Sequence, residues 1–102
     1  MQDWHIYLVR TRHGSLYTGV ATDVARRLVE HEGAGGRGAK YLRSKGPLQL
    51  AYEMKIGDRA LALKVERCVK KLSKEQKERI VTATPDGQEL LLLLGLSESV
   101  TT

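Results

Sequence analysis

Apolar and polar positions alternate in two short segments near the start of the chain. In Trp4–Thr11, Ile6 and Leu8 fall on one face of an extended segment and Tyr7 falls on the other. Ser15–Ala21 has a similar extended pattern, and a His-Gly pair lies between the two segments. This arrangement is typical of a β-hairpin.

The length of the hairpin loop decides whether two tyrosines share a face of the sheet. A two-residue loop pairs Tyr7 with Val20 and places Tyr7 and Tyr17 on opposite faces. A three-residue loop, Arg12–Gly14 with its glycine in the left-handed region, pairs Val9 with Tyr17 instead. Both tyrosines then lie on one face, and we predict this second arrangement.

Helical periodicity and turn residues divide the rest of the chain. A helix capped by Thr22 or Asp23 is predicted to run to about Glu32. A glycine-rich basic loop, a third strand, two further helices and a short leucine-rich helix follow. In chain order these segments are Gly33–Gly46, Pro47–Lys55, Asp58–Leu72, Lys74–Val81 and Gln88–Leu94. Ser73 and Gln76 have the spacing of a capping box.

The predicted order β-β-α-β-α-α, with the short helix after it, indicates an α+β fold. The hairpin and the third strand form a small three-stranded sheet, antiparallel or mixed, flanked by helices in a sandwich-like arrangement. We expect residues 1–83 to form one domain, and residues 84–102 to form a short C-terminal helix and a frayed tail.

The composition of the chain indicates which classes of partner and which cellular compartment to expect. The chain has 102 residues, a formal net charge of +5 and a sequence pI of about 9.6, so an anionic partner such as nucleic acid or an acidic membrane surface is plausible. Cys68 is the only cysteine, which fits a reducing compartment and the cytoplasm. Met1–Arg10 lacks the pattern of a signal peptide, and the longest apolar run, Leu90–Leu94, is too short to span a bilayer.

Arg27 and His31 are four residues apart, so they project from one face of the first predicted helix. If this helix packs beside the hairpin, both side chains can reach the face that carries Tyr7 and Tyr17. A guanidinium binds phosphate oxygens bidentately, while phenols and imidazoles can move protons. These four residues are a candidate phosphate site, although packed tyrosines and a solvated arginine would have the same pattern.

Glu66 lies just beyond the apolar stripe of the helix predicted over Asp58–Leu72. A carboxylate there can hold one divalent cation, because Mg²⁺ often uses only one or two protein carboxylates and keeps several waters. A surface ion pair with Lys70, four residues later, is the simpler interpretation from the residues alone.

The glycine-rich loop combines positive charge with an aromatic side chain, which suits contacts with a DNA or RNA backbone. A solvated loop would have the same composition. The candidate nucleic-acid-binding residues in this loop are Arg37, Lys40, Tyr41, Arg43 and Lys45.

Taken together, these motifs resemble the GIY-YIG nuclease superfamily. His5-Ile6-Tyr7 stands in the place of the GIY triplet, and Tyr17-Thr18-Gly19 stands in the place of YIG. Arg27 and His31 follow at the family's spacing, and the family's metal-binding glutamate matches Glu66. The resemblance spans about residues 4–72 and extends to the small stand-alone YhbQ-like bacterial proteins.

The resemblance implies an endonuclease that cleaves DNA phosphodiester bonds with Mg²⁺ or Mn²⁺, in DNA repair or processing. It makes Tyr7 or Tyr17 the base with help from His31, Arg27 the ligand of the scissile phosphate, and Glu66 the metal ligand. Because no sequence-reading domain is evident, we expect selection of branched, nicked or single-stranded DNA, or of DNA ends, over selection of a sequence.

Two departures from the family pattern leave alternatives open. Val20 stands where some members carry a lysine, and the chain contains no asparagine where many members have one that contacts phosphate. A DNA- or RNA-binding module without catalysis is one alternative. Another is a nuclease subunit that needs a protein partner, for which Leu90–Leu94 would be the docking face.

Overall fold

A three-stranded antiparallel sheet with four helices makes up the described part of the chain, residues 2–31 and 47–96 of the computed structural model. The strands pair in the order β2-β1-β3. The elements are β1 (Trp4–Arg10), β2 (Leu16–Ala21), α1 (Val24–His31), β3 (Gln49–Gly57), α2 (Arg59–Lys70), α3 (Lys74–Ala83) and α4 (Gly87–Leu93). The predicted α+β fold is confirmed, and both strand pairs in the sheet are antiparallel.

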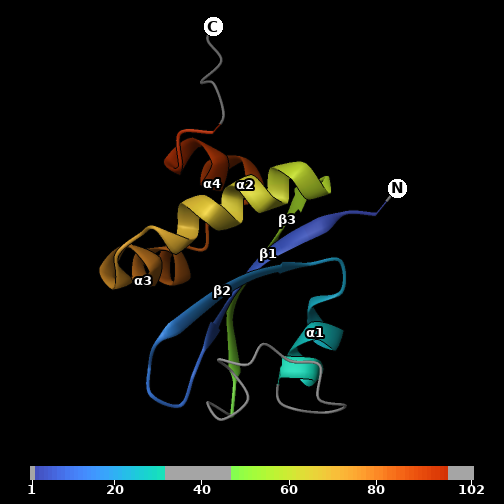
Figure 1. The fold of residues 1–102 in the computed structure, drawn as a ribbon. Coiled ribbons are helices and arrows are strands. Elements are labelled where there is room, and N and C mark those ends of the chain that lie inside the picture. Colours follow the sequence, from blue (N-terminus) through green and yellow to red (C-terminus); the bar gives the residue numbers. More distant parts are fainter. Residues whose placement is uncertain (1, 32–46, 97–102) are drawn as a thin grey trace, which may run out of the picture.

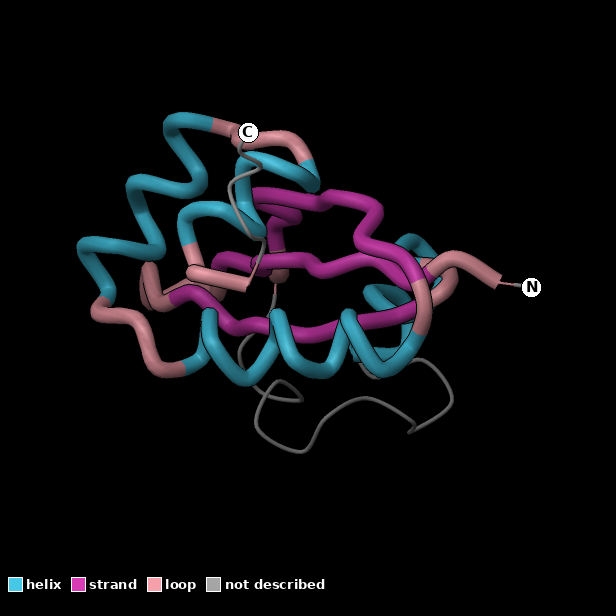
Figure 2. Tube along the Cα trace, turned by 90° about the horizontal axis from the view of Figure 1, so that it is seen from above, coloured by secondary structure: helices cyan, strands magenta, loops and turns pink. Residues whose placement is uncertain are grey.

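Helices cover both faces of the sheet. In Figure 1, α2, α3 and α4 lie on one side and α1 lies on the other. Figure 2 shows the same layers from above, with α2 running along the sheet. The alternation in β1 creates two small cores: Ile6 and Leu8 pack with Val65 of α2, whereas Tyr7 packs with Val24 of α1. The second core is the one that positions the candidate site.

The hairpin has the three-residue loop that the sequence predicts. The backbone amide of Thr11 donates to the carbonyl of Ser15 at 2.9 Å, and Val9 pairs with Tyr17. Gly14 has a φ of 88°, a left-handed conformation that glycine adopts without a steric cost. This register places Tyr7 and Tyr17 on the same face.

Short polar side chains cap the N-termini of the helices. The Asp23 carboxylate accepts a hydrogen bond from the backbone amide of Arg26 at 3.1 Å, so Asp23 is the cap of α1. At α3, the Ser73 hydroxyl accepts from the Gln76 amide at 3.1 Å, and the Gln76 side chain accepts from the Ser73 amide at 3.0 Å. The predicted capping box is therefore confirmed.

The leucine run of α4 is divided between core and surface. Leu90 is fully buried, whereas Leu92 is 46% exposed and Leu93 is 68% exposed. The Tyr52 hydroxyl donates to the Pro85 carbonyl at 2.6 Å and ties the start of α4 to β3. The domain boundary at residues 83 and 84 stays a prediction. Within residues 2–31 and 47–96, no helix has the length and apolar character needed to cross a membrane.

Thr18 carries a buried hydroxyl without a hydrogen-bond partner in the described part of the chain. Its side chain is 2% exposed. Burial of an unpartnered hydroxyl costs about 1–3 kcal/mol. We expect Thr18→Val, which keeps the branched shape, to raise the free energy of unfolding by about 1 kcal/mol in urea denaturation.

Thr11 provides the matched control for this substitution. It is 4% exposed, but its hydroxyl lies 2.8 Å from the Ser15 hydroxyl. Thr11→Val removes a hydrogen bond and is expected to lower stability by about 1 kcal/mol. If both valine variants are destabilised equally, the Thr18 hydroxyl is not an unpartnered group.

Candidate active site

A buried tyrosine–histidine pair joins the sheet to α1. The Tyr7 hydroxyl of β1 lies 2.8 Å from Nε2 of His31, the last residue of α1. Tyr7 is 1% exposed and His31 is fully buried. The hairpin register had placed Tyr7 on one face of the sheet, and the helical spacing had placed His31 on one face of the helix. The structure brings these two residues together.

Gly19 makes room for the Tyr7 ring. It pairs with Tyr7 across the hairpin, and a Cβ atom added at Gly19 would overlap the Tyr7 ring and its hydroxyl. The phenol therefore lies directly over the backbone of β2. Glycine is required here because of this close approach, and not because of a left-handed backbone.

Tyr17 contacts the same histidine from the other strand of the hairpin. Its ring centroid lies 5.6 Å from that of His31, with the rings nearly perpendicular at 72°. Unlike Tyr7, Tyr17 is partly exposed. The imidazole therefore lies between a buried phenol and one that solvent can reach.

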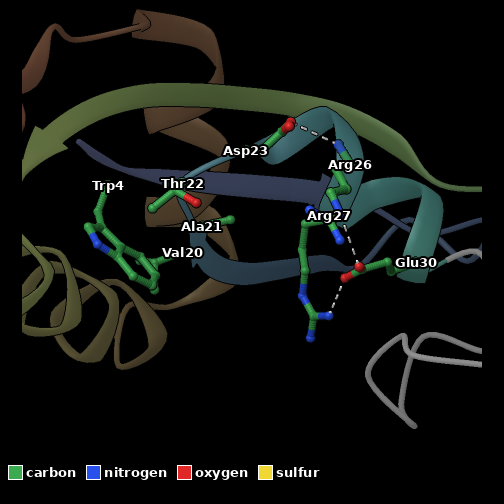
Figure 3. Close-up of a pocket in the computed structure, with 8 residues that line it drawn as sticks. All are labelled: Trp4, Val20, Ala21, Thr22, Asp23, Arg26, Arg27 and Glu30. Atoms are coloured by element: carbon green, nitrogen blue, oxygen red, sulfur yellow. Dashed lines mark hydrogen bonds and ion pairs between the residues drawn. The ribbon is translucent and has the colours of Figure 1, made fainter. Parts of the chain in front are cut away.

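Arg27 brings positive charge to this face. One of its guanidinium nitrogens lies 2.8 Å from the Glu30 carboxylate, and its side chain is 35% exposed. Arg26 also approaches Glu30, at 3.7 Å, so one carboxylate pairs with two arginines (Figure 3). The Arg27 guanidinium also acts to lower the pKa of the Tyr7 phenol.

Burial dominates the acid–base properties of the pair. Burial raises the pKa of Tyr7 to about 12, and the neighbouring Tyr17 and Glu66 act in the same direction against Arg27. Burial also lowers the pKa of His31, and the charge of Arg27 lowers it further, against the opposing effect of Glu30. At neutral pH, Tyr7 is protonated and His31 is neutral.

Glu66 lies on α2, which packs against β2 and β1. Its carboxylate is 19% exposed and lies 3.4 Å from the Lys70 ammonium, so the predicted ion pair is present. The same carboxylate raises the pKa of Tyr7, which places its charge within range of the phenol. Glu66 is therefore a member of an ion pair, and its charge has a minor effect on the pKa of Tyr7.

The side chains at this site fit a hydrated divalent cation. Among residues 2–31 and 47–96, no group of three or more His, Cys, Asp or Glu side chains is arranged to hold a metal. A closed zinc site needs four such ligands. Mg²⁺ binds through one or two carboxylates and keeps several waters, so a partly exposed carboxylate such as Glu66 has the right chemistry.

The sequence interpretation missed Glu30, whose signal was its spacing of three and four residues from Arg27 and Arg26. It also treated Gly19 only as part of a motif. The predicted nucleic-acid contacts lie outside the described residues: Arg37, Lys40, Tyr41, Arg43 and Lys45.

The burial of His31 predicts a pH-dependent contribution to stability. Its pKa in the folded protein lies below the value of about 6.5 expected when unfolded, so the unfolded chain takes up protons first as the pH falls. The contribution is fully present above about pH 6.5 and is lost as the pH falls through the folded pKa.

We expect the stability difference between wild type and His31→Gln to be smaller at pH 5.5 than at pH 7.5, measured by urea denaturation. A pH-independent difference for His31→Gln would mean that His31 binds protons equally in both states.

Comparison with known proteins identifies the family of this chain. Residues 3–79 match the GIY-YIG catalytic domain. The chain belongs to the GIY-YIG family. Its relatives include the UPF0213 protein YE0453 of Yersinia enterocolitica, 54% identical over 89 residues, which are 87% of this chain and 90% of that protein. A UPF0213 protein of Yersinia pestis is 56% identical over 82 residues, 80% of this chain and 84% of the relative.

Two solved structures are similar to this chain in fold, one of them that of a UPF0213 protein. The solution structure of BH0048 from Bacillus halodurans is 33% identical, with a TM-score of 0.52, over 98% of this chain and all of the other. That of EF2693 from E. faecalis is 34% identical, with a TM-score of 0.57, over 82% and 88% of the two chains. The GIY-YIG family is a nuclease family that acts on DNA and typically uses a divalent metal.

Proposed function

We propose that this GIY-YIG protein is a metal-dependent endonuclease that cleaves DNA phosphodiester bonds. We further propose that it selects DNA structure or ends, has little sequence specificity, and acts in DNA repair or processing in the cytoplasm. The observation that carries the proposal is the buried Tyr7–His31 hydrogen bond, with the Tyr17 ring against the same imidazole. The charges of Arg27 and Glu66 both act on the pKa of Tyr7.

Tyr17 is the better candidate for the base. Tyr7 is buried and has a pKa of about 12, so it stays protonated and fixes the orientation of His31 through its hydrogen bond with Nε2. Tyr17 lies against the same imidazole and is accessible to an attacking water. A free phenol has a pKa near 10, so taking a proton from water at pH 7 requires nearby positive charge.

Arg27, and a divalent cation held by Glu66, would supply that positive charge in different ways. Arg27 would bind the scissile phosphate and offset its charge as the bond to the attacking oxygen forms. Arg27 is paired with Glu30, so the phosphate has to compete with this carboxylate for the guanidinium. A divalent cation held by Glu66 would lower the pKa of a bound water and further offset charge on the phosphate.

A metal-dependent cleavage panel tests this function. Nicked, branched, single-stranded and blunt duplex DNA are incubated with Mg²⁺ or Mn²⁺, and with EDTA as the control. We expect cleavage of at least one of the nicked, branched and single-stranded substrates with metal, and no cleavage with EDTA. Salt-sensitive binding without cleavage on any substrate or metal would instead support the binding module.

A further inference from the structure

A cavity of about 300 Å³ opens beside Arg27, where β2 leads into α1. Figure 3 shows Trp4 on one side of this cavity and the two arginines, Arg26 and Arg27, on the other. Val20 and Ala21 lie between them and supply apolar surface. The cavity is at the small end of the range for ligand sites, which is roughly 300–1,000 Å³.

We propose that this cavity binds one unpaired nucleobase of the DNA substrate, stacked on Trp4 and next to the phosphate that Arg27 would hold. The inference rests on the proposed nuclease function, and it names the part of the substrate that this face selects. Nothing in the proposed catalytic steps requires Trp4, so the two claims can fail separately.

Trp4 offers an oriented aromatic surface. It is partly exposed, and the guanidinium of Arg59 lies over its ring, 5.8 Å from the centroid. Such a cation–π contact restrains the indole. Arg59 does not line the cavity, so it holds the ring without filling the space that a base would take. Stacking of bases on aromatic side chains is the usual way in which proteins hold single-stranded nucleic acid.

The charged side chains that line the cavity favour a base inside it and phosphates at its rim. The Arg26 side chain is 71% exposed, so its guanidinium can follow the backbone of a bound strand. Asp23 and Glu30 also line the cavity, and their carboxylates would repel a phosphate within it. A neutral base is therefore favoured inside, with its flanking phosphates near Arg26 and Arg27.

The bound nucleotide has to be unpaired. A base in a duplex cannot leave its stack without loss of pairing and stacking energy, and this cost is smallest in single strands, flaps and frayed ends. A base site next to the scissile phosphate would therefore select these structures without reading a sequence.

The single tryptophan allows a direct test. Trp4 fluorescence is recorded while a single-stranded oligonucleotide is added in EDTA, so that binding is measured without cleavage. We expect strong quenching by the normal oligonucleotide. An oligonucleotide of the same length with only abasic sugars should bind with little quenching. Anisotropy of a labelled end reports binding independently of the tryptophan.

Two arginine variants with matched surroundings test the rim of the cavity. Arg26 is 71% exposed and lies 3.7 Å from Glu30, and Arg79 is 72% exposed and lies 3.7 Å from Glu75 on α3. Each substitution by alanine removes one positive charge. We expect Arg26→Ala to weaken the affinity for the normal oligonucleotide, measured from the quenching curve, roughly fivefold or more. Arg79→Ala is expected to change this affinity less than twofold.

A second pair of variants tests stacking itself. Trp4→Leu is expected to weaken binding by anisotropy between roughly fivefold and a hundredfold, the range for loss of one stacked base, whereas Trp4→Phe keeps most of the affinity. Equal quenching by normal and abasic oligonucleotides would overturn the base site, as would binding without quenching. Metal-dependent cleavage together with either of these results would overturn the base site and leave the nuclease proposal standing. Base-dependent quenching without cleavage would support the base site and overturn the nuclease proposal. No binding at all by anisotropy would overturn both.

Discussion

Replacing Glu66 with alanine is expected to reduce metal-dependent DNA cleavage by about a thousandfold or more. Stabilisation of transition-state charge by a bound metal is worth several kcal/mol, and about 1.4 kcal/mol corresponds to each tenfold change in rate. Glu66 is the proposed metal ligand, and its charge also acts on the pKa of Tyr7, so its loss removes the group that would hold the cation. The measurement is the single-turnover cleavage rate at saturating Mg²⁺.

Glu75→Ala is the matched control for this prediction. Glu75 also forms a helical ion pair four residues along the chain, with Arg79 at 3.7 Å, and is 79% exposed on α3. Both substitutions remove one negative charge from a helix surface. We expect Glu75→Ala to cleave at the wild-type rate, and equal rates for the two variants would remove Glu66 from the metal site.

A second readout separates metal binding from loss of the fold. A ligand that binds only the folded state raises its stability. Mg²⁺ or Mn²⁺ should therefore raise the melting temperature of wild type and of Glu75→Ala, but not of Glu66→Ala. Loss of the Lys70 pair alone should change stability by only a few tenths of a kcal/mol, because that pair is at the surface of one helix.

Local features of the site could be predicted from the sequence. The hairpin register follows from alternation and from a glycine at one loop position, and it determines that Tyr7 and Tyr17 share a face. The spacing of Arg27 and His31 along a helix follows from helical geometry. Each of these inferences uses residues that are close in the chain, where backbone geometry decides which side chains are neighbours.

Features that depend on packing between distant segments could not be predicted. Glu66 belongs to α2, and only the packing of this helix against the hairpin shows that its charge reaches Tyr7. From the residues alone, the Lys70 pair was the favoured interpretation, and the structure contains that pair. Trp4 had no predicted role because its cavity forms only where the hairpin meets α1.

The contact between Gly19 and Tyr7 leads to the second large prediction. Gly19→Ala places a methyl group where the Tyr7 ring and hydroxyl now lie, so the phenol has to move away from His31. Overpacking of this kind typically costs about 1–3 kcal/mol. We expect a loss of stability in this range, and a loss of cleavage greater than the unfolded fraction explains, because His31 loses the hydrogen bond that orients it.

A double-mutant cycle shows whether the effect acts through the tyrosine. Tyr7→Leu removes the atoms that the new methyl group would strike, so Gly19→Ala should cost much less stability in that background. Residues in direct contact show interaction energies of about 0.5–3 kcal/mol, whereas independent sites are additive within about 0.5 kcal/mol. Additive free energies of unfolding would mean that the two residues do not touch, and that the glycine of this motif has a role other than making room for Tyr7.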